Sequence, residues 1–159
     1  MIRTTARQSA AAVLLMRTLL FLVSLSLLGG AALAQSQPPK GPPQTFIIYF
    51  HSGSTKLTSM DMQTVARAAA AVTQAKGQGT FSHVKVIGYS DSRGSINSAQ
   101  HISEQRAFAV RDALVHAGVP RQEIGTEGRG KLEPEVAASD QVNQPRNRRV
   151  RIIIYRPGD

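Results

Sequence analysis

The order of the apolar segments restricts the possible folds of this chain more than any other feature. Four short segments rich in β-branched and aromatic residues have the character of strands, and two longer segments repeat apolar residues at helical spacing. Their order predicts a β-α-β-α-β-β chain. Two helices for four strands favour an α/β (α+β) two-layer sandwich, with both helices on one face of a mixed four-stranded sheet.

Turn and capping residues place the limits of these elements. The first helix is expected to start after Thr58, which forms a capping pattern with Asp61, and to stop at Gly77. The second is expected to start after Ser95 and to stop at Gly118. The expected strands cover residues 45–50, 83–89, 124–127 and 148–155. The stripes expected to face the sheet are Met62, Val65, Ala66, Ala69 and Val72 in the first helix, and Ala99, Ile102, Arg106, Ala109, Val110, Ala113 and Leu114 in the second.

The N-terminal residues have the three-part pattern of a secretory signal peptide. Basic residues come first, an uncharged run covers residues 18–34, and Ala32-Leu33-Ala34 supplies a small-residue cleavage pattern. The alternative is an uncleaved membrane anchor, although the run is at the short end of the ~17–25 residues that a spanning helix needs. We therefore expect a signal peptide at 1–34, a Pro-rich linker at 35–44 and one domain at 45–159.

Composition argues against several kinds of site. The chain has no cysteine, which excludes a disulfide framework and a lipid on an N-terminal cysteine. No two of its four histidines are spaced i, i+4, so we expect neither a metal nor a cofactor. No serine lies in a nucleophile-elbow pattern, and we expect no catalytic residues. The formal net charge of +9 at pH 7 suits an anionic polymer or a membrane surface, and it is equally often a matter of solubility.

Asp91 and Arg106 are the strongest candidates for a site. Arg106 lies on the predicted buried stripe of the second helix, where a guanidinium is costly unless it is paired. Asp91 follows the second strand, and ligands of open α/β sheets favour the carboxyl ends of strands. Spacing leaves two interpretations open. The two side chains form an internal ion pair, or Asp91 binds an ammonium group while Arg106 binds a carboxylate of the same ligand.

A basic cluster near the C-terminus is the second candidate. It comprises Arg146, Arg148, Arg149 and Arg151. On a strand, Arg149 and Arg151 would share one face while Val150 takes the other. That face is either solvated or in contact with a phosphate or glycan polymer. A nucleic-acid partner is not expected, because the cluster has only Tyr155 as an aromatic neighbour.

Several motifs, in this order, resemble the OmpA-like C-terminal peptidoglycan-binding domain. They are "YSDSRGS", "HISEQRAFAVRDAL", "GVP", "IGTEGRG" and "NRRVRI", and the resemblance covers about residues 45–155. The positions that match the family pattern are Asp91, Gly94, Ser103, Arg106, Ala107, Val110, Gly118, Asn147, Arg148, Arg149 and Val150. The resemblance implies a noncovalent cell-wall anchor in which Asp91 and Arg106 grip the amino and carboxylate groups of diaminopimelate in the peptide stem.

The resemblance also supplies the rest of the expected ligand-binding set. Ser90, Gly94, Ser103 and Arg149 join Asp91 and Arg106 on this basis. Ser90 stands where the family usually has threonine, and it keeps the hydroxyl. Ala99 stands where the family usually has an asparagine near the ligand, which removes one polar contact.

The function expected from the sequence is therefore binding without catalysis, by an exported protein of the periplasm, associated with the cell wall or outer membrane. Its expected partner is peptidoglycan with diaminopimelate in the stem, together with an outer-membrane or envelope protein that the sequence does not identify. The alternative is a membrane-tethered subunit that anchors a stator or secretion machine to the wall. A glycan-cleaving enzyme would need a second carboxylate across a cleft from Asp91, and the sequence places none beside it.

Overall fold

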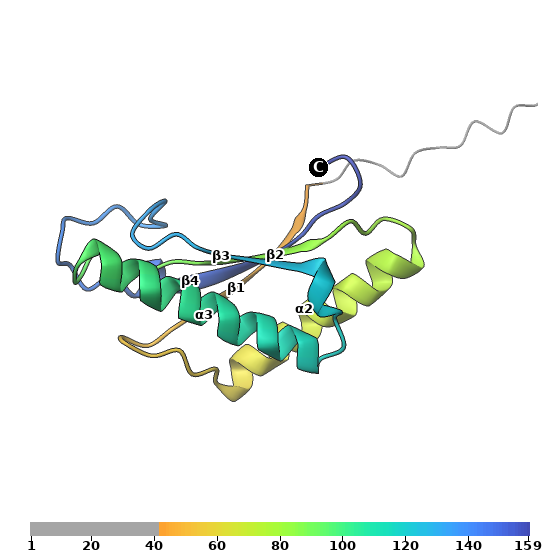
Figure 1. The fold of residues 1–159 in the computed structure, drawn as a ribbon, viewed down its shortest axis with the longest axis horizontal. Helices are drawn as coiled ribbons and strands as arrows, with labels where there is room; N and C mark the ends of the chain where they lie inside the picture. The colour runs from red at the N-terminus through yellow and green to blue at the C-terminus, as the bar shows by residue number, and fades with distance from the viewer. Residues whose placement is uncertain (1–41) are drawn as a thin grey trace, which may run out of the picture. The chain divides into compact units, whose positions relative to one another are not determined.

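The computed structural model describes residues 42–159, which form a sheet and two long helices (Figure 1). The predicted signal peptide and most of the predicted linker lie outside these residues. The elements in chain order are β1 (Gln44–Tyr49), α2 (Ser59–Gly77), β2 (Val84–Gly88), α3 (Ile96–His116), η1 (Arg121–Glu123), β3 (Ile124–Gly128), η2 (Pro145–Asn147) and β4 (Arg149–Ile154). The predicted order and the mixed α/β class are confirmed.

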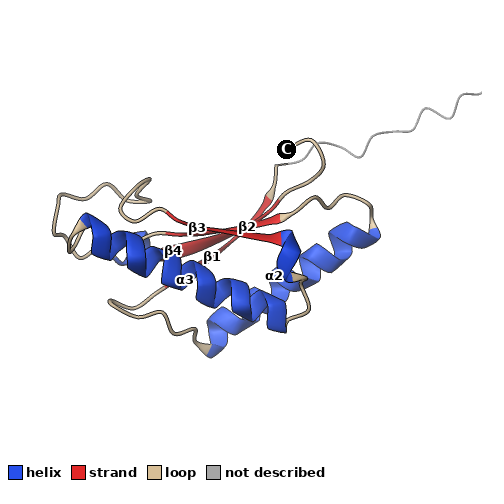
Figure 2. Cartoon of the chain, in the orientation of Figure 1, coloured by secondary structure: helices blue, strands red, loops and turns tan. Residues whose placement is uncertain are grey.

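The strands form a mixed sheet in the order β1-β4-β2-β3. β4 pairs antiparallel with β1 on one side and with β2 on the other, while β2 and β3 run parallel. The strand that comes last in the sequence therefore lies inside the sheet. Figure 2 shows both helices on the same side of the strands.

Both helices begin at the predicted caps. Thr58 and Asp61 form a complete capping box, in which the Thr58 N–H donates to Asp61 Oδ2 at 2.8 Å and Asp61 N–H donates to Thr58 Oγ1 at 3.3 Å. The Ser95 hydroxyl accepts from the Ser98 N–H at 3.1 Å and caps α3. These bonds satisfy backbone donors that the first helical turns leave free.

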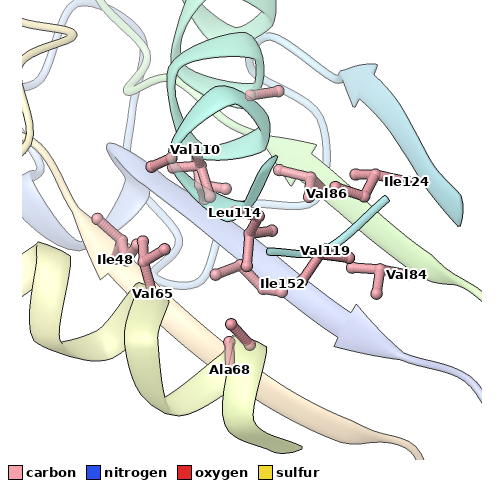
Figure 3. Close-up of a cluster of buried hydrophobic side chains, with 14 of the residues drawn as sticks. Ile48, Val65, Ala68, Val84, Val86, Val110, Leu114, Val119, Ile124 and Ile152 are labelled. Atoms are coloured by element: carbon pink, nitrogen blue, oxygen red, sulfur yellow. The ribbon is translucent and has the colours of Figure 1, made fainter. Parts of the chain in front are cut away.

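The apolar core fills the space between the sheet and the helices (Figure 3). The buried residues of α2 are Val65, Ala68, Ala69 and Val72, and those of α3 are Ala99, Ser103, Arg106, Ala107, Val110, Ala113 and Leu114. The expected stripes are thus wrong in part. Met62 and Ala66 are exposed, because α2 is rotated so that Ala68 faces the sheet. In α3, Ile102 and Ala109 are half-buried.

Two glycines let α3 lie close to the sheet. Gly88 and Gly128 are partners in the β2–β3 register. A Cβ at Gly88 would lie 1.9 Å from the carbonyl oxygen of Ser103, and one at Gly128 would lie 2.7 Å from the backbone N of Glu104. The close approach fixes the N-terminal half of α3 over the ends of β2 and β3, where the candidate site lies.

No helix of residues 42–159 lies on the opposite face of the sheet. Ile87, Tyr89 and Ile153 form a small buried cluster there, with Tyr155 packed against it. We call this surface the open face. Neither helix of residues 42–159 has both the length and the apolar character needed to cross a membrane.

Candidate functional site

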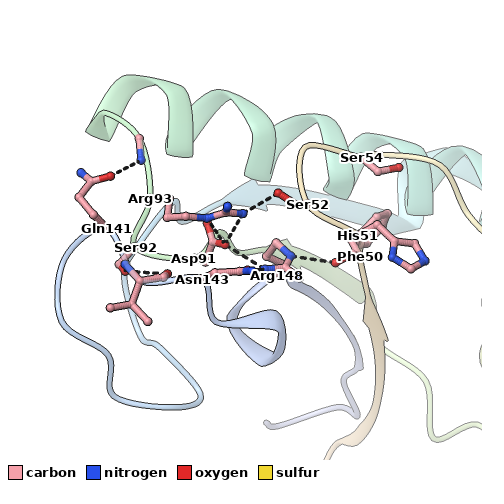
Figure 4. Close-up of polar contacts among 12 residues, drawn as sticks. Phe50, His51, Ser52, Ser54, Asp91, Ser92, Arg93, Gln141, Asn143 and Arg148 are labelled. Carbon is pink, nitrogen blue, oxygen red and sulfur yellow. Dashed lines mark hydrogen bonds and ion pairs between the residues drawn. The ribbon is translucent and has the colours of Figure 1, made fainter.

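Asp91 lies just beyond the carboxyl end of β2 and is 5% exposed. Its Oδ2 atom accepts from Arg148 Nη1 at 3.0 Å and from Arg93 Nε at 3.1 Å (Figure 4). Among the hydrogen bonds of residues 42–159, none reaches the second carboxylate oxygen, Oδ1. The carboxylate is thus held by two guanidinium groups on one side and keeps one oxygen for another donor.

Arg106 is buried in α3, with 1% exposure. Its Nε donates to the Ser54 carbonyl at 3.0 Å, Nη1 to the Tyr89 carbonyl at 3.2 Å and Nη2 to the His51 carbonyl at 3.2 Å. Burial lowers the pKa of Arg106 to about 10, below the usual range of a guanidinium. The Arg148 charge adds to this effect and the Asp91 charge opposes it. The side chain stays charged at neutral pH, and backbone carbonyls take the place of water around it.

Asp91 and Arg106 share a site but are not partners of one another. No ion pair within residues 42–159 joins them, so the internal ion pair considered from the sequence is wrong in its pairing. Arg148 takes the place expected for Arg106, since its side chain (8% exposed) and that of Asp91 (6% exposed) form a buried pair. The charges of Arg148 and Asp91 act on Arg106 at longer range.

Arg148 was expected in the basic cluster and not beside Asp91, although the sequence contained a signal for this position. Alternation along β4 puts Arg149 on one face and Val150 on the other, so Arg148 belongs to the side of Val150, under the helices. A guanidinium there needs an anion. Besides Asp91, Arg148 donates to the Phe50 carbonyl at 3.0 Å and to Asn143 Oδ1 at 2.5 Å.

Arg93 was also missed, because it lies in the loop between β2 and α3 where periodicity says nothing about side-chain direction. Its side chain is 37% exposed and pairs with Asp91 Oδ2 at 3.1 Å through Nη2. The same nitrogen donates to Ser52 Oγ at 2.5 Å, across to the loop that follows β1 (Figure 4). We call Arg93, Arg106 and Arg148 the arginine cluster; with Asp91 it contains three cations and one anion.

The other predicted site residues support this loop. Ser90 is 8% exposed, next to Asp91, and its N–H donates to the Gly130 carbonyl at 2.7 Å. Gly94 has a φ of +75°, a conformation that suits glycine, and its N–H donates to Gln141 Oε1 at 3.0 Å. Ser103 is fully buried; its hydroxyl donates to the Gln100 carbonyl at 2.7 Å and accepts from the Gly130 N–H at 2.9 Å. Both bonds of the Ser103 hydroxyl are thus made within the domain, and the ligand contact expected from the resemblance stays a prediction.

Arg149 lies away from Asp91, on the open face. Its guanidinium stacks 4.0 Å from the Tyr89 ring centroid and donates to the Glu133 carbonyl at 2.9 Å. It is 5% exposed, and burial lowers its pKa. The solvated strand face considered for this residue is wrong, because the loop of residues 131–147 covers it. Its place in the ligand-binding set stays a prediction, and in this structure its guanidinium contacts Tyr89 and Glu133 and not Asp91.

Asn147 fastens that loop. Its Oδ1 accepts from the Val136 N–H at 2.9 Å and its Nδ2 donates to the Val136 carbonyl at 2.8 Å.

Glu135 pairs with Arg146 and Arg149, and it accepts from the Tyr49 hydroxyl at 3.0 Å. Burial opposes ionisation of Glu135, but the bonds from Arg146 and Tyr49 prevail and lower its pKa. Most of the predicted basic cluster is thus neutralised internally.

Comparison with known proteins identifies the family of this chain. The model of the OmpA family matches residues 49–148. An "Outer membrane protein" of Gluconacetobacter diazotrophicus is 31% identical over 125 residues, which cover 72% of this chain and 31% of that protein. The "Peptidoglycan-associated lipoprotein" of Legionella pneumophila is 37% identical over 70 residues, 44% of this chain and 40% of that protein. The chain therefore spans about a third of the length of the curated relatives it matches.

Solved structures show the same fold. The peptidoglycan-associated lipoprotein from Burkholderia pseudomallei superposes with a TM-score of 0.60 at 23% identity, over 68% of this chain and 88% of that one. The cell wall anchor of the T6SS from Pseudomonas aeruginosa has a TM-score of 0.56 at 25% identity, over 72% of this chain and 82% of that one. The family match covers more than half of the sequence and includes Asp91 and Arg106. The chain therefore belongs to the OmpA family.

Proposed function

We propose that this protein is a noncovalent peptidoglycan-binding module of the bacterial envelope, and that Asp91 and the arginine cluster form its binding site. The observation that carries the proposal is a buried carboxylate, Asp91, which keeps its Oδ1 free among three guanidinium groups. Such a cluster can accept one ammonium and has cationic charge in excess for carboxylates. A diaminopimelate head group in a stem peptide has both.

The expected roles differ between the two main residues. Asp91 would receive the ligand ammonium, since its Oδ1 accepts no hydrogen bond within residues 42–159 and one of the two cations on Oδ2, Arg93, is solvent-exposed and can give way. Arg106 would receive the carboxylate, and this requires that the ligand replace a carbonyl at its guanidinium. The carbonyls of His51 and Ser54 are the replaceable ones, because they belong to an external turn, whereas Tyr89 follows β2. We call residues 51–54 the 51–54 turn.

Relatives support the class of ligand. Proteins named for peptidoglycan association or binding are among the curated relatives and the structural neighbours. The proposed activity is binding alone, with no chemical step. An envelope protein as a second partner remains a proposal from the sequence, without an assigned surface.

Ligand chemistry tests the proposal independently of folding. Two stem tripeptides are compared by calorimetry, one with meso-diaminopimelate and one with lysine at the third position. Lysine keeps the side-chain ammonium but lacks the carboxylate on the same carbon, so a desolvated guanidinium would be left without its anion. We expect clearly weaker binding of the lysine peptide. Equal affinities would remove the carboxylate-reading role of Arg106.

Site variants give the second test, by co-sedimentation with intact peptidoglycan. Asp91→Asn and Arg106→Gln should each lose most binding, since loss of one partner in a buried charged contact costs about 2–5 kcal/mol. Arg67→Ala is a matched control, because Arg67 is an exposed arginine of α2 on no part of this site. Urea unfolding of each variant separates loss of contact from loss of fold. Binding retained in both site variants would overturn the assignment.

A further inference from the structure

Arg93 occupies the solvent side of Asp91. Its Nε and Nη2 atoms both lie 3.1 Å from Asp91 Oδ2, so the guanidinium forms a forked contact with the carboxylate oxygen. The side chain is 37% exposed, against 8% for Arg148 on the same oxygen. Arg148 is fixed by burial, whereas Arg93 can leave into solvent at little cost. Of the two cations that neutralise Asp91, only Arg93 is exchangeable.

A cationic group that approaches Asp91 from solvent meets the charge of Arg93 first. While Arg93 stays in place, the carboxylate is shared by two cations and attracts a third one weakly. When Arg93 leaves, an ammonium gains an acceptor whose remaining partner is a single buried guanidinium. Release of Arg93 therefore raises the affinity of the site for ammonium groups.

The other end of Arg93 restrains the 51–54 turn. Its Nη2 donates to Ser52 Oγ at 2.5 Å (Figure 4). The His51 and Ser54 carbonyls of the same turn accept hydrogen bonds from Arg106. The exposed side chain of Arg93 thus bonds both to Asp91 and to the 51–54 turn that covers Arg106. The two halves of the site become available together when this side chain moves.

We propose that Arg93 is a specificity-determining residue, an internal counter-ion that competes with the ligand's ammonium for Asp91 and latches the 51–54 turn through Ser52. The inference rests on the proposed function and assigns a new role within that site. If Arg93 competes in this way, the binding free energy of the wild-type protein is the free energy gained from the ligand contacts minus the free energy lost when Arg93 leaves Asp91. Ligands without an ammonium at this position cannot displace it.

Calorimetry with the diaminopimelate stem tripeptide tests the role in four purified variants. Arg93→Ala should bind about fivefold more tightly than wild type, the ratio that corresponds to loss of a competing partly exposed ion pair of about 1 kcal/mol. Arg93→Lys should restore wild-type affinity, because it restores the competing charge. Ser52→Ala should show a smaller gain, since only the latch is lost. Arg67→Ala should show none.

A modified ligand excludes a merely structural explanation. The same peptide acetylated on the free ammonium of diaminopimelate should gain no more from Arg93→Ala than from Ser52→Ala, because it presents no cation to Asp91 and only the loss of the bond to Ser52 can help it. Weaker binding by Arg93→Ala would show that Arg93 contacts the ligand directly, and equal binding would show that it does not compete; either result overturns this role while leaving the proposed function intact. Absence of binding by wild type and every variant would overturn the proposed function, and this role with it.

Discussion

The Asp91–Arg148 pair should be a main stabilising contact of this end of the domain, and Asp91→Asn tests it. The two side chains are 6% and 8% exposed, with 3.0 Å between Arg148 Nη1 and Asp91 Oδ2. Removal of one partner from a buried pair costs about 3–5 kcal/mol, because the other charge stays buried without compensation. Arg148 retains the Phe50 carbonyl and Asn143, which favours the lower end. We expect a loss of about 3 kcal/mol in the free energy of unfolding.

Urea unfolding of two double-mutant cycles measures the contact. The first combines Asp91→Asn with Arg148→Met, and the second combines Asp91→Asn with Arg93→Ala. The coupling energy should reach about 2 kcal/mol or more in the first, as for contacting residues of one network. It should stay below about 1 kcal/mol in the second, because Arg93 is exposed to solvent. A cost below about 1 kcal/mol for Asp91→Asn, or a larger coupling to Arg93 than to Arg148, would refute this reasoning.

Four further outcomes can be checked by urea unfolding, with exchange measurements for the third. Gly88→Ala should destabilise the fold by at least about 1–3 kcal/mol, because its Cβ would lie 1.9 Å from the Ser103 carbonyl oxygen of α3. Gly125→Ala is the matched control and should cost less, because its Cβ would lie at an ordinary 3.9 Å from the Val84 carbonyl oxygen. Thr58→Ala should cost about 0.5–2 kcal/mol through loss of the capping box, and an unchanged midpoint would contradict that role. Asn147→Ala should speed amide exchange in residues 131–147, because both bonds from its side chain to the Val136 backbone are lost. Unchanged exchange would show that these bonds do not hold the loop in place. The pKa of Glu135 lies below 4.5 in the folded state, so its ionised form stabilises the fold above pH 4.5, and this stabilisation is lost as the pH falls through the folded-state pKa. The free energy of unfolding of Glu135→Gln should therefore differ from that of wild type near neutral pH and converge with it in acid. A stability difference that is independent of pH would exclude ionisation as the cause.

Local signals were sufficient to predict the elements and their layers. Thr58 with Asp61 marked the start of α2, and the alternation around Val150 marked β4 as a strand with two unlike faces. The rotation of α2 was not predictable in detail, because most residues along its middle are alanines and several faces look equally apolar. Packing against β1 and α3 selects the face with Ala68.

The candidate site was predicted in position but not in pairing. Asp91 and Arg106 were identified by their places on a strand end and a helix stripe. Their partners come from segments distant in the sequence: Arg148 lies 57 positions from Asp91, and the carbonyl of His51 lies 55 positions from Arg106. Such contacts depend on strand order, and periodicity along one element carries no information about it.

The position of β4 inside the sheet has a consequence for how the chain acquires its structure. Within residues 42–159, the only strand beside β1 is β4, which begins 100 residues after β1 ends, and β2 is joined to β1 through the same strand. A nascent chain that has emerged only as far as η2 can pair β2 with β3, but it leaves β1 and its apolar residues without a partner. Long-range closure of this kind slows folding and makes it cooperative. We therefore expect that the N-terminal half of the domain does not fold by itself, and that Arg148, which holds Asp91, reaches the site together with the strand that completes the sheet.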